Sequence, residues 1–119
     1  MMKHTICHIE WSSTDLERTK KFLSGLFDWE FEYWGENYLL FSPPEGVGGG
    51  IARMDKVNPG DSPLVHIEVD DIEPYLEKAK KLGGGVAAPK TEIPTVGWYA
   101  VLTDPDENLV ALFQGIKEE

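Results

Sequence analysis

The residues with the clearest chemical potential belong to a His-Ile-Glu tripeptide that occurs twice in the chain. Side chains two residues apart in a β-strand lie on the same face, so His8 would share a face with Glu10. In the second copy, His66 would share a face with Glu68 for the same reason. Two imidazoles with two carboxylates form a ligand set of the type that suits Zn²⁺, Fe²⁺ or Ni²⁺. A His–Glu pair can also move a proton near neutral pH, because the imidazole titrates there and a carboxylate can orient its ring. A hydrogen-bonded histidine on a partly wet sheet face is the alternative for each copy.

The tripeptides also mark an internal duplication. Each is followed by an Asp-apolar-Glu segment, at 15–17 and at 71–73. The tripeptides are 58 residues apart and these segments are 56 apart in a chain of 119, so about half the chain is repeated. We therefore expect a single domain over 1–119 that consists of two modules, about 4–54 and 62–115.

The elements that must position these residues follow the same order in both modules. Residues 6–11 alternate, with Cys7, Ile9 and Trp11 on the side expected to face a helix and the His/Glu side opposite. Thr14 with Glu17 has the spacing of a capping box, which predicts a helix start at Thr14. The expected elements are a strand, a helix and three strands in each module: 6–11, 14–27, 30–34, 37–41 and 49–54, then 64–69, 71–82, 86–88, 98–103 and 109–114. Two helices among adjacent short strands predict an α+β fold with a mainly antiparallel sheet.

The charge and composition of the chain limit the kinds of partner and the cellular compartment that we expect for it. The formal net charge is −10, which disfavours nucleic acid and anionic membrane surfaces as partners. Cys7 is the single cysteine of the sequence, so an internal disulfide is impossible and a reducing compartment is expected. The first ten residues lack the pattern of a signal peptide, and no apolar run approaches the roughly 20 residues of a membrane helix. These features predict a soluble, cytoplasmic protein.

A set of short segments in a fixed order resembles the vicinal oxygen chelate superfamily, also called the glyoxalase/bleomycin-resistance/dioxygenase superfamily. The nearest resemblance is to its branch of predicted enzymes related to lactoylglutathione lyase. The resemblance covers nearly the whole chain, in the segments 8–10, 15–18, 22–29, 48–50, 69–71, 97–101, 104–105 and 112–114. It implies two βαβββ modules whose sheets curl into a half-barrel around a shared cavity, with the helices outside. Many members dimerise, so a homodimer is expected, with the modules paired either within one chain or across the dimer.

In metal-using members of this superfamily, His or Glu side chains from particular strands hold a divalent ion. The resemblance assigns the first ligand position to His8. The corresponding positions in the second module are Leu64 and Ala111, and the strand 49–54 has no His, Asp or Glu. A lone imidazole does not hold a catalytic divalent ion. We therefore expect no resident metal or other cofactor, with a divalent metal as the alternative.

The four residues of the two tripeptides could form a different set if both polar faces point into the cavity. His66 is two residues nearer its helix than His8, a shift of about 6.6 Å along a strand, which favours spreading over convergence. Trp98, with Trp34 and Tyr38, could line a ligand cavity or a dimer interface.

Two further positions carry conformational expectations. Gly48-Gly49-Gly50 is interpreted as a bend or bulge at a strand start, or as a flexible cavity rim. Glu107 stands where the turn of the superfamily usually has glycine, which suggests a positive φ there.

The sequence thus favours a protein that binds a small molecule in the cavity between its modules without the usual catalytic metal. The expected ligand contacts are His8, Glu10, His66, Glu68 and Trp98. An acidic lining would favour neutral or cationic ligands, and side-chain acid/base catalysis belongs to the same hypothesis. The alternative function is a divalent-metal-dependent lyase, isomerase or dioxygenase of the glyoxalase type. A third hypothesis is a structural domain that dimerises through its sheet edge.

Overall fold

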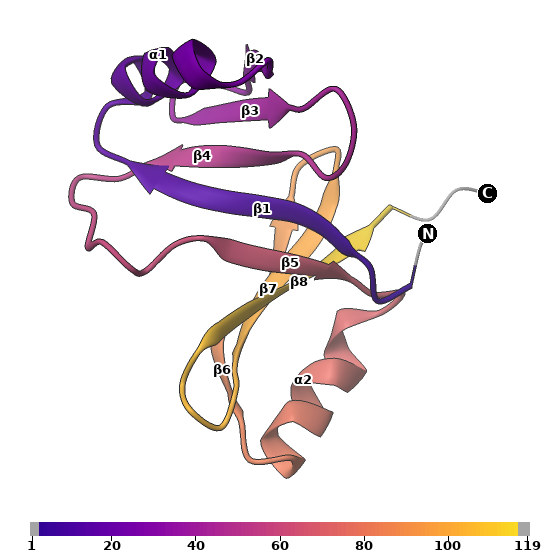
Figure 1. The fold of residues 1–119 in the computed structure, drawn as a ribbon. Helices are drawn as coiled ribbons and strands as arrows, with labels where there is room; N and C mark the ends of the chain where they lie inside the picture. Colours follow the sequence, from indigo (N-terminus) through magenta and orange to yellow (C-terminus); the bar gives the residue numbers. More distant parts are fainter. Residues whose placement is uncertain (1–2, 117–119) are drawn as a thin grey trace. The chain divides into compact units, whose positions relative to one another are not determined.

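The computed structural model describes residues 3–116, which divide into two compact units (Figure 1). The N-terminal unit is Cys7–Leu64. The C-terminal unit begins at Val65 and also includes the segment up to Ile6. Backbone hydrogen bonds tie that segment to its unit, because the His4 amide donates to the Glu68 carbonyl and the Glu68 amide donates to the Thr5 carbonyl. Within residues 3–116, neither helix has the length and apolar character needed to cross a membrane.

The N-terminal unit has a four-stranded sheet in the order β2-β3-β4-β1. β1 runs parallel to β4, and the other two pairings are antiparallel. The elements are β1 (Ile6–Ser13), α1 (Leu16–Leu26), β2 (Glu30–Tyr33), β3 (Tyr38–Ser42) and β4 (Gly49–Arg53).

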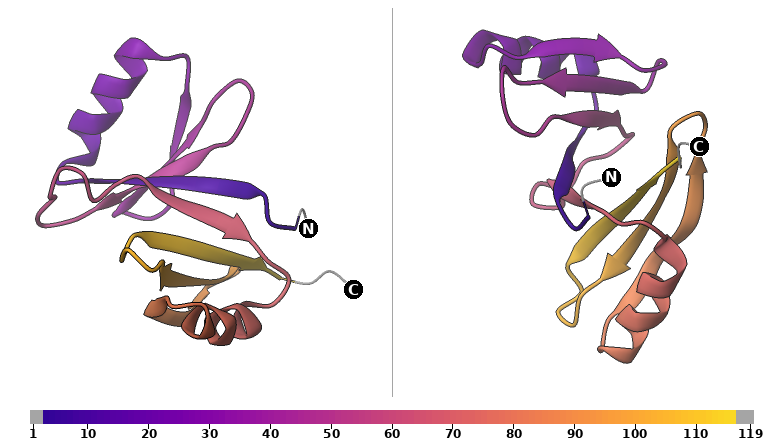
Figure 2. Two further views of the ribbon diagram at one scale, coloured as in Figure 1. Left: turned by 60° about the horizontal axis from the view of Figure 1, so that its bottom comes forward. Right: turned by 90° about the vertical axis from the view of Figure 1, so that its right-hand side faces the viewer.

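The C-terminal unit repeats this arrangement with the order β5-β8-β7-β6, in which β5 and β8 are parallel. Its elements are β5 (Leu64–Glu68), α2 (Ile72–Lys81), β6 (Gly85–Ile93), β7 (Gly97–Thr103) and β8 (Leu109–Gly115). Each helix packs against one face of the sheet of its own unit (Figure 2). The predicted α+β class and the predicted order of strand, helix and three strands, twice, are confirmed.

The start of α1 differs by one residue from the predicted capping box. Asp15, not Thr14, is the N-cap, and its carboxylate accepts a hydrogen bond from the Arg18 amide at 3.1 Å. The Thr14 hydroxyl instead accepts from the Arg18 guanidinium at 2.9 Å. Ser13 holds this arrangement, because its hydroxyl accepts from the Asp15 amide at 3.0 Å. Ser13, Thr14 and Asp15 are all residue types that cap helices well, so these local hydrogen bonds decide at which of them α1 begins.

The buried stripe of α1 is narrower than its apolar pattern suggests. Leu16 is buried and Leu23 packs against the same core. Phe22 and Leu26, four residues apart on the flank of that stripe, are 67% and 60% exposed. A helix that packs on a small four-stranded sheet buries only the side chains that point directly at the sheet. Phe22 and Leu26 lie beside that stripe and therefore remain on the surface.

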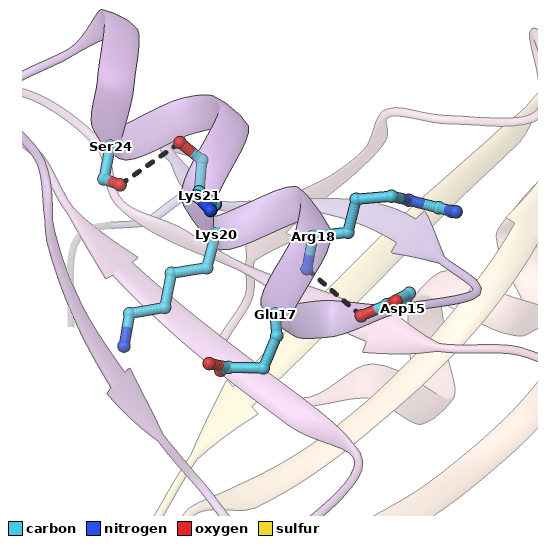
Figure 3. A pocket seen from close by; sticks show the side chains of 6 residues that line it. All are labelled: Asp15, Glu17, Arg18, Lys20, Lys21 and Ser24. Atoms are coloured by element: carbon cyan, nitrogen blue, oxygen red, sulfur yellow. Dashed lines mark hydrogen bonds between the residues drawn. The ribbon is translucent and has the colours of Figure 1, made fainter.

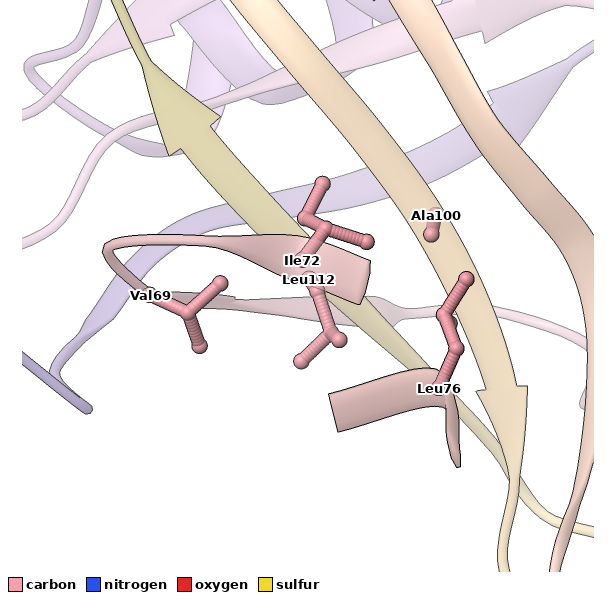
Figure 4. Close-up of a cluster of buried hydrophobic side chains, with 5 residues drawn as sticks. All are labelled: Val69, Ile72, Leu76, Ala100 and Leu112. Atoms are coloured by element: carbon pink, nitrogen blue, oxygen red, sulfur yellow. The ribbon is translucent and has the colours of Figure 1, made fainter. Parts of the chain in front are cut away.

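The core of the C-terminal unit lies between α2 and its sheet (Figure 4). Its buried members are Val69, Ile72, Leu76, Ala100 and Leu112. A polar residue completes it, since the buried Gln114 side chain of β8 accepts the Ile72 amide hydrogen at 2.9 Å. The N-cap residue Asp71 makes no side-chain cap bond. The first free amide of α2 is therefore satisfied from the sheet.

β6 extends well beyond the predicted 86–88 and runs through Pro89 to Ile93. Its pairing with β7 shifts register between Val86 and Ala88 and again between Ala88 and Thr91. Proline cannot donate to a ladder, but an edge strand with a bulge tolerates it. The predicted strand ended at about Ala88 or Pro89, whereas the edge position of β6 lets the strand continue beyond the proline.

The hairpin between β7 and β8 confirms the expected positive φ at Glu107, which is 67°. One carboxylate organises this hairpin: Asp104 accepts from the Asp106 amide at 2.9 Å and from the Asn108 amide at 2.8 Å. The Asn108 side chain also donates to it at 3.0 Å. These bonds from Asn108 hold the pKa of Asp104 below its usual value.

Candidate functional site

The two faces of the N-terminal sheet have opposite characters. Trp11 of β1 packs into the core under α1, against Leu39, Phe41 and Ile51. His8 and Glu10 alternate with it along β1, so they lie on the face away from α1. The predicted assignment of the apolar side of this strand to its helix agrees with that packing.

Tyr38 joins His8 to Glu10. Its hydroxyl donates to the Glu10 Oε1 at 2.8 Å and lies 2.7 Å from the His8 Nε2. A phenol has one proton, and that proton is directed at the carboxylate. The second contact therefore requires a hydrogen on Nε2, which assigns the tautomer of His8. The result is a continuous chain of hydrogen bonds, His8 to Tyr38 to Glu10.

The surroundings keep the phenol of Tyr38 protonated. Burial raises the pKa of Tyr38 well above its ordinary value, and the charge and the hydrogen bond of Glu10 raise it further. Tyr38 is therefore a hydrogen-bond donor to Glu10 throughout the ordinary pH range. The sequence named Tyr38 only as one of three aromatic residues for a ligand cavity or a dimer interface, because its link to β1 depends on a strand register that the sequence does not give.

Glycines of β4 make this arrangement possible. A Cβ on Gly50 would lie 2.1–2.2 Å from three atoms of Tyr38, so the tyrosine ring lies across bare backbone. On the other face, a Cβ on Gly49 would lie 1.8 Å from the Ile9 carbonyl oxygen and 2.7 Å from the Phe41 ring. Both glycines are buried within β4. The predicted bend, bulge or flexible rim is therefore corrected for these two: they are strand residues that admit an aromatic ring on each face.

The planes of the Tyr38 and His8 rings are nearly parallel, and a hydrogen bond joins the two rings at their polar ends. Their planes differ by 15° and their centroids are 6.2 Å apart, while the bonded hydroxyl and nitrogen are at 2.7 Å. Such a short edge contact at that separation means end-to-end rings. The Trp34 ring stands almost perpendicular to Tyr38, at 81° and 6.3 Å between centroids. We call Trp34, Tyr38, His8 and Glu10 the aromatic–carboxylate corner.

The C-terminal unit places its predicted residues on two different faces. His66 and Glu68 share the face of β5 opposite Ile67, which packs against the core under α2. Trp98 packs against that same core, and the Lys90 ammonium lies 5.0 Å from its ring centroid. The structure thus does not bring Trp98 together with His66 and Glu68. The sequence pattern did not show which side chains of β7 lie on which face of the sheet.

The donor positions that the resemblance assigns do not fit a divalent ion. His8 supplies one nitrogen, and its Nε2 is directed at Tyr38. Ala111, fully buried in β8, pairs with His66 and has no donor atom, and β4 has no His, Asp or Glu. Across residues 3–116, no group of three or more His, Cys, Asp or Glu side chains is arranged to hold a metal ion.

A shallow hollow lies along α1 and is separate from the corner (Figure 3). Side chains of both charges line it: Asp15, Glu17, Arg18, Lys20, Lys21 and Ser24. The Tyr33 hydroxyl donates to Glu17 beside it, and the Lys20 ammonium lies over the Tyr33 ring. None of the predicted ligand contacts takes part in it.

A family model identifies the family of the chain, and solved structures share its fold. The profile of the Glyoxalase/Bleomycin resistance protein/Dioxygenase superfamily matches residues 5–112. A curated relative, "Putative glyoxylase CFP32" of Mycobacterium bovis, is 27% identical over an alignment of 123 positions that covers 89% of this chain. The chain spans 44% of the length of that relative.

Two solved structures share the fold at low identity. A member of the same superfamily from Vibrio splendidus 12B01 has a TM-score of 0.69 and 16% identity, with 92% of this chain and 99% of that one covered. The Mn(II)-bound glyoxalase from Novosphingobium aromaticivorans has a TM-score of 0.68 and 17% identity, with 98% of this chain and 42% of that one covered. These similarities confirm the predicted glyoxalase-type α+β fold.

Proposed function

Because the chain belongs to the Glyoxalase/Bleomycin resistance protein/Dioxygenase superfamily, we propose that it binds a small molecule without a resident metal, and that the aromatic–carboxylate corner contacts the ligand. The observation that carries this proposal is the hydrogen-bonded chain of His8, Tyr38 and Glu10 on the sheet face away from α1. It supplies what small-molecule sites usually have, an aromatic surface with a few fixed polar groups.

The ligand positions of the superfamily support the metal-free part of the proposal. A catalytic divalent ion takes about three protein ligands and keeps an open position for substrate. Leu64 and Ala111 provide none at the assigned positions. The nitrogen of His8 is instead used to fix Tyr38, and the carboxylate of Glu10 accepts from the same phenol.

A screen of small-molecule fragments by amide NMR, with a chelator present, tests this function. We expect saturable hits that shift the amides of Glu10, Tyr38 and Gly50 and that disappear in Tyr38→Ala. Tyr33→Ala, which removes an exposed tyrosine on the helix side of the same unit, is the matched control and should keep the hits. Hits confined to other surfaces, or unchanged in Tyr38→Ala, would refute the proposal.

A metal-dependent lyase, isomerase or dioxygenase is the second candidate. One observation favours it: His8 occupies the first-strand position at which metal-using members have a ligand. The alternative predicts that a divalent ion displaces Tyr38 from His8. We also retain a cytoplasmic homodimer as part of the proposal, and light scattering of the purified chain tests its oligomeric state.

A further inference from the structure

We propose that the ligand of this site is a flat organic cation that carries an N–H donor. The inference rests on the proposed function and specifies the chemical class of its ligand. Its basis is the arrangement of four side chains from β1, β3 and the turn after β2, namely His8, Glu10, Tyr38 and Trp34.

The nearly parallel, hydrogen-bonded rings of Tyr38 and His8 together form an aromatic surface longer than either ring alone. Gly50 supports the tyrosine ring from the backbone side, so the ring cannot sink into the sheet. Trp34, 46% exposed, stands nearly perpendicular at the other end of Tyr38 and limits how a stacked molecule can slide. A flat molecule fits such a floor and wall, because offset stacking on one ring and an edge contact with another are both favourable.

The charge of the corner selects a cation. Glu10 accepts from Tyr38 through Oε1, so Oε2 is the oxygen of this carboxylate that would accept from a donor on the ligand. A phenol that donates to a carboxylate has a more electron-rich ring, and such a ring attracts a positive charge over its face. Glu32 of β2 lies opposite Leu40 and shares this sheet face with Trp34 and Tyr38, which adds a second carboxylate. An anion would meet repulsion from both carboxylates.

Two fluorescent probes of the same size and opposite charge test the inference on the full chain. Proflavine is a flat tricyclic cation with N–H donors, and anthracene-2-carboxylate is a flat tricyclic anion. We expect proflavine to bind with saturation and to be preferred at least 10-fold. Trp34→Leu and Glu10→Gln should each weaken proflavine at least fivefold. Glu45→Gln, which removes an exposed carboxylate in a loop of the same unit, should leave its affinity unchanged.

The outcomes separate the inference from the function on which it rests. Proflavine that fails to bind, binds no better than the anion, or binds equally to Trp34→Leu and Glu10→Gln would overturn the cationic class. If the anion or a neutral fragment then binds and this binding is lost in Tyr38→Ala, the proposed small-molecule binding at this corner is kept and only the cationic ligand class is rejected. If no probe or fragment depends on Tyr38, both fail.

Discussion

Replacing Gly50 by alanine should displace the Tyr38 ring and so break the hydrogen bonds of the aromatic–carboxylate corner. The new Cβ would lie 2.1–2.2 Å from three atoms of Tyr38, whereas ordinary contacts begin near 3.4 Å. The ring must therefore retreat by more than about 1 Å, which breaks its bonds to His8 at 2.7 Å and to Glu10 at 2.8 Å. Each bond contributes about 0.5–1.5 kcal/mol net, and alanine returns roughly 0.5 kcal/mol of strand preference. We expect Gly50→Ala to lower the free energy of unfolding by about 0.5–2.5 kcal/mol.

Urea unfolding at pH 7, followed by tryptophan fluorescence, measures this cost. A double-mutant cycle with Tyr38→Ala isolates its cause, because the added methyl group then has no ring to displace. Gly50→Ala should cost little or nothing in the Tyr38→Ala background. Gly25→Ala is the matched control: nothing lies within 4 Å of its Cβ in α1, so it should stabilise by about 0.5–1 kcal/mol. An equal cost of Gly50→Ala with and without the Tyr38 ring would refute the reasoning.

Three further changes test the fold and the site. Glu107→Gly should raise the free energy of unfolding by up to about 1 kcal/mol in urea melts, because glycine adopts the φ of 67° without strain; a clear loss would contradict the turn geometry. Gln114→Leu should lower it by about 1–3 kcal/mol, since the buried Ile72 amide loses its acceptor, while Gln114→Glu should lose less because it keeps an acceptor; equal losses would reject the cap. The raised pKa of Tyr38 contributes stability that is complete below about pH 10 and is lost as the pH rises above it, so wild type should lose more stability than Tyr38→Phe between pH 9 and 11; parallel pH curves would exclude this linkage.

The fold was predictable because local and global signals agree along this chain. Strict alternation in β1, with Trp11 on the apolar side, identifies a strand with one face on a helix. The repeated tripeptide predicts the module order. The resemblance to a superfamily that usually has glycine at the position of Glu107 predicts the sign of one backbone angle. What local patterns missed were effects of neighbours: the cap taken by Asp15, and the edge position that lets β6 continue through Pro89.

The candidate site was predictable only in part. His8 and Glu10 were selected because they alternate on the polar side of one strand. Their link through Tyr38 depends on the β3–β4 register, which sets Leu40 opposite Gly50 and lets the ring of Tyr38 reach across that glycine. A sequence read one strand at a time contains no such register. The missing register also explains why the sequence grouped Trp98 with His66 and Glu68, which the structure does not bring together with it. The face of β7 on which Trp98 lies follows from the pairing of β7 with β8, not from the residues next to Trp98 in the sequence.

Metal content tests the central claim of metal-free binding most directly. The protein, untagged and purified without chelator, is analysed by elemental mass spectrometry before and after incubation with Zn²⁺, Ni²⁺, Fe²⁺ and Mn²⁺. We predict no stoichiometric divalent ion in any sample, because the assigned positions Leu64 and Ala111 have no donor atoms and His8 is bonded to Tyr38. Close to one ion per chain in wild type, lost in His8→Ala, would contradict the account and support a metal-dependent enzyme of the glyoxalase type.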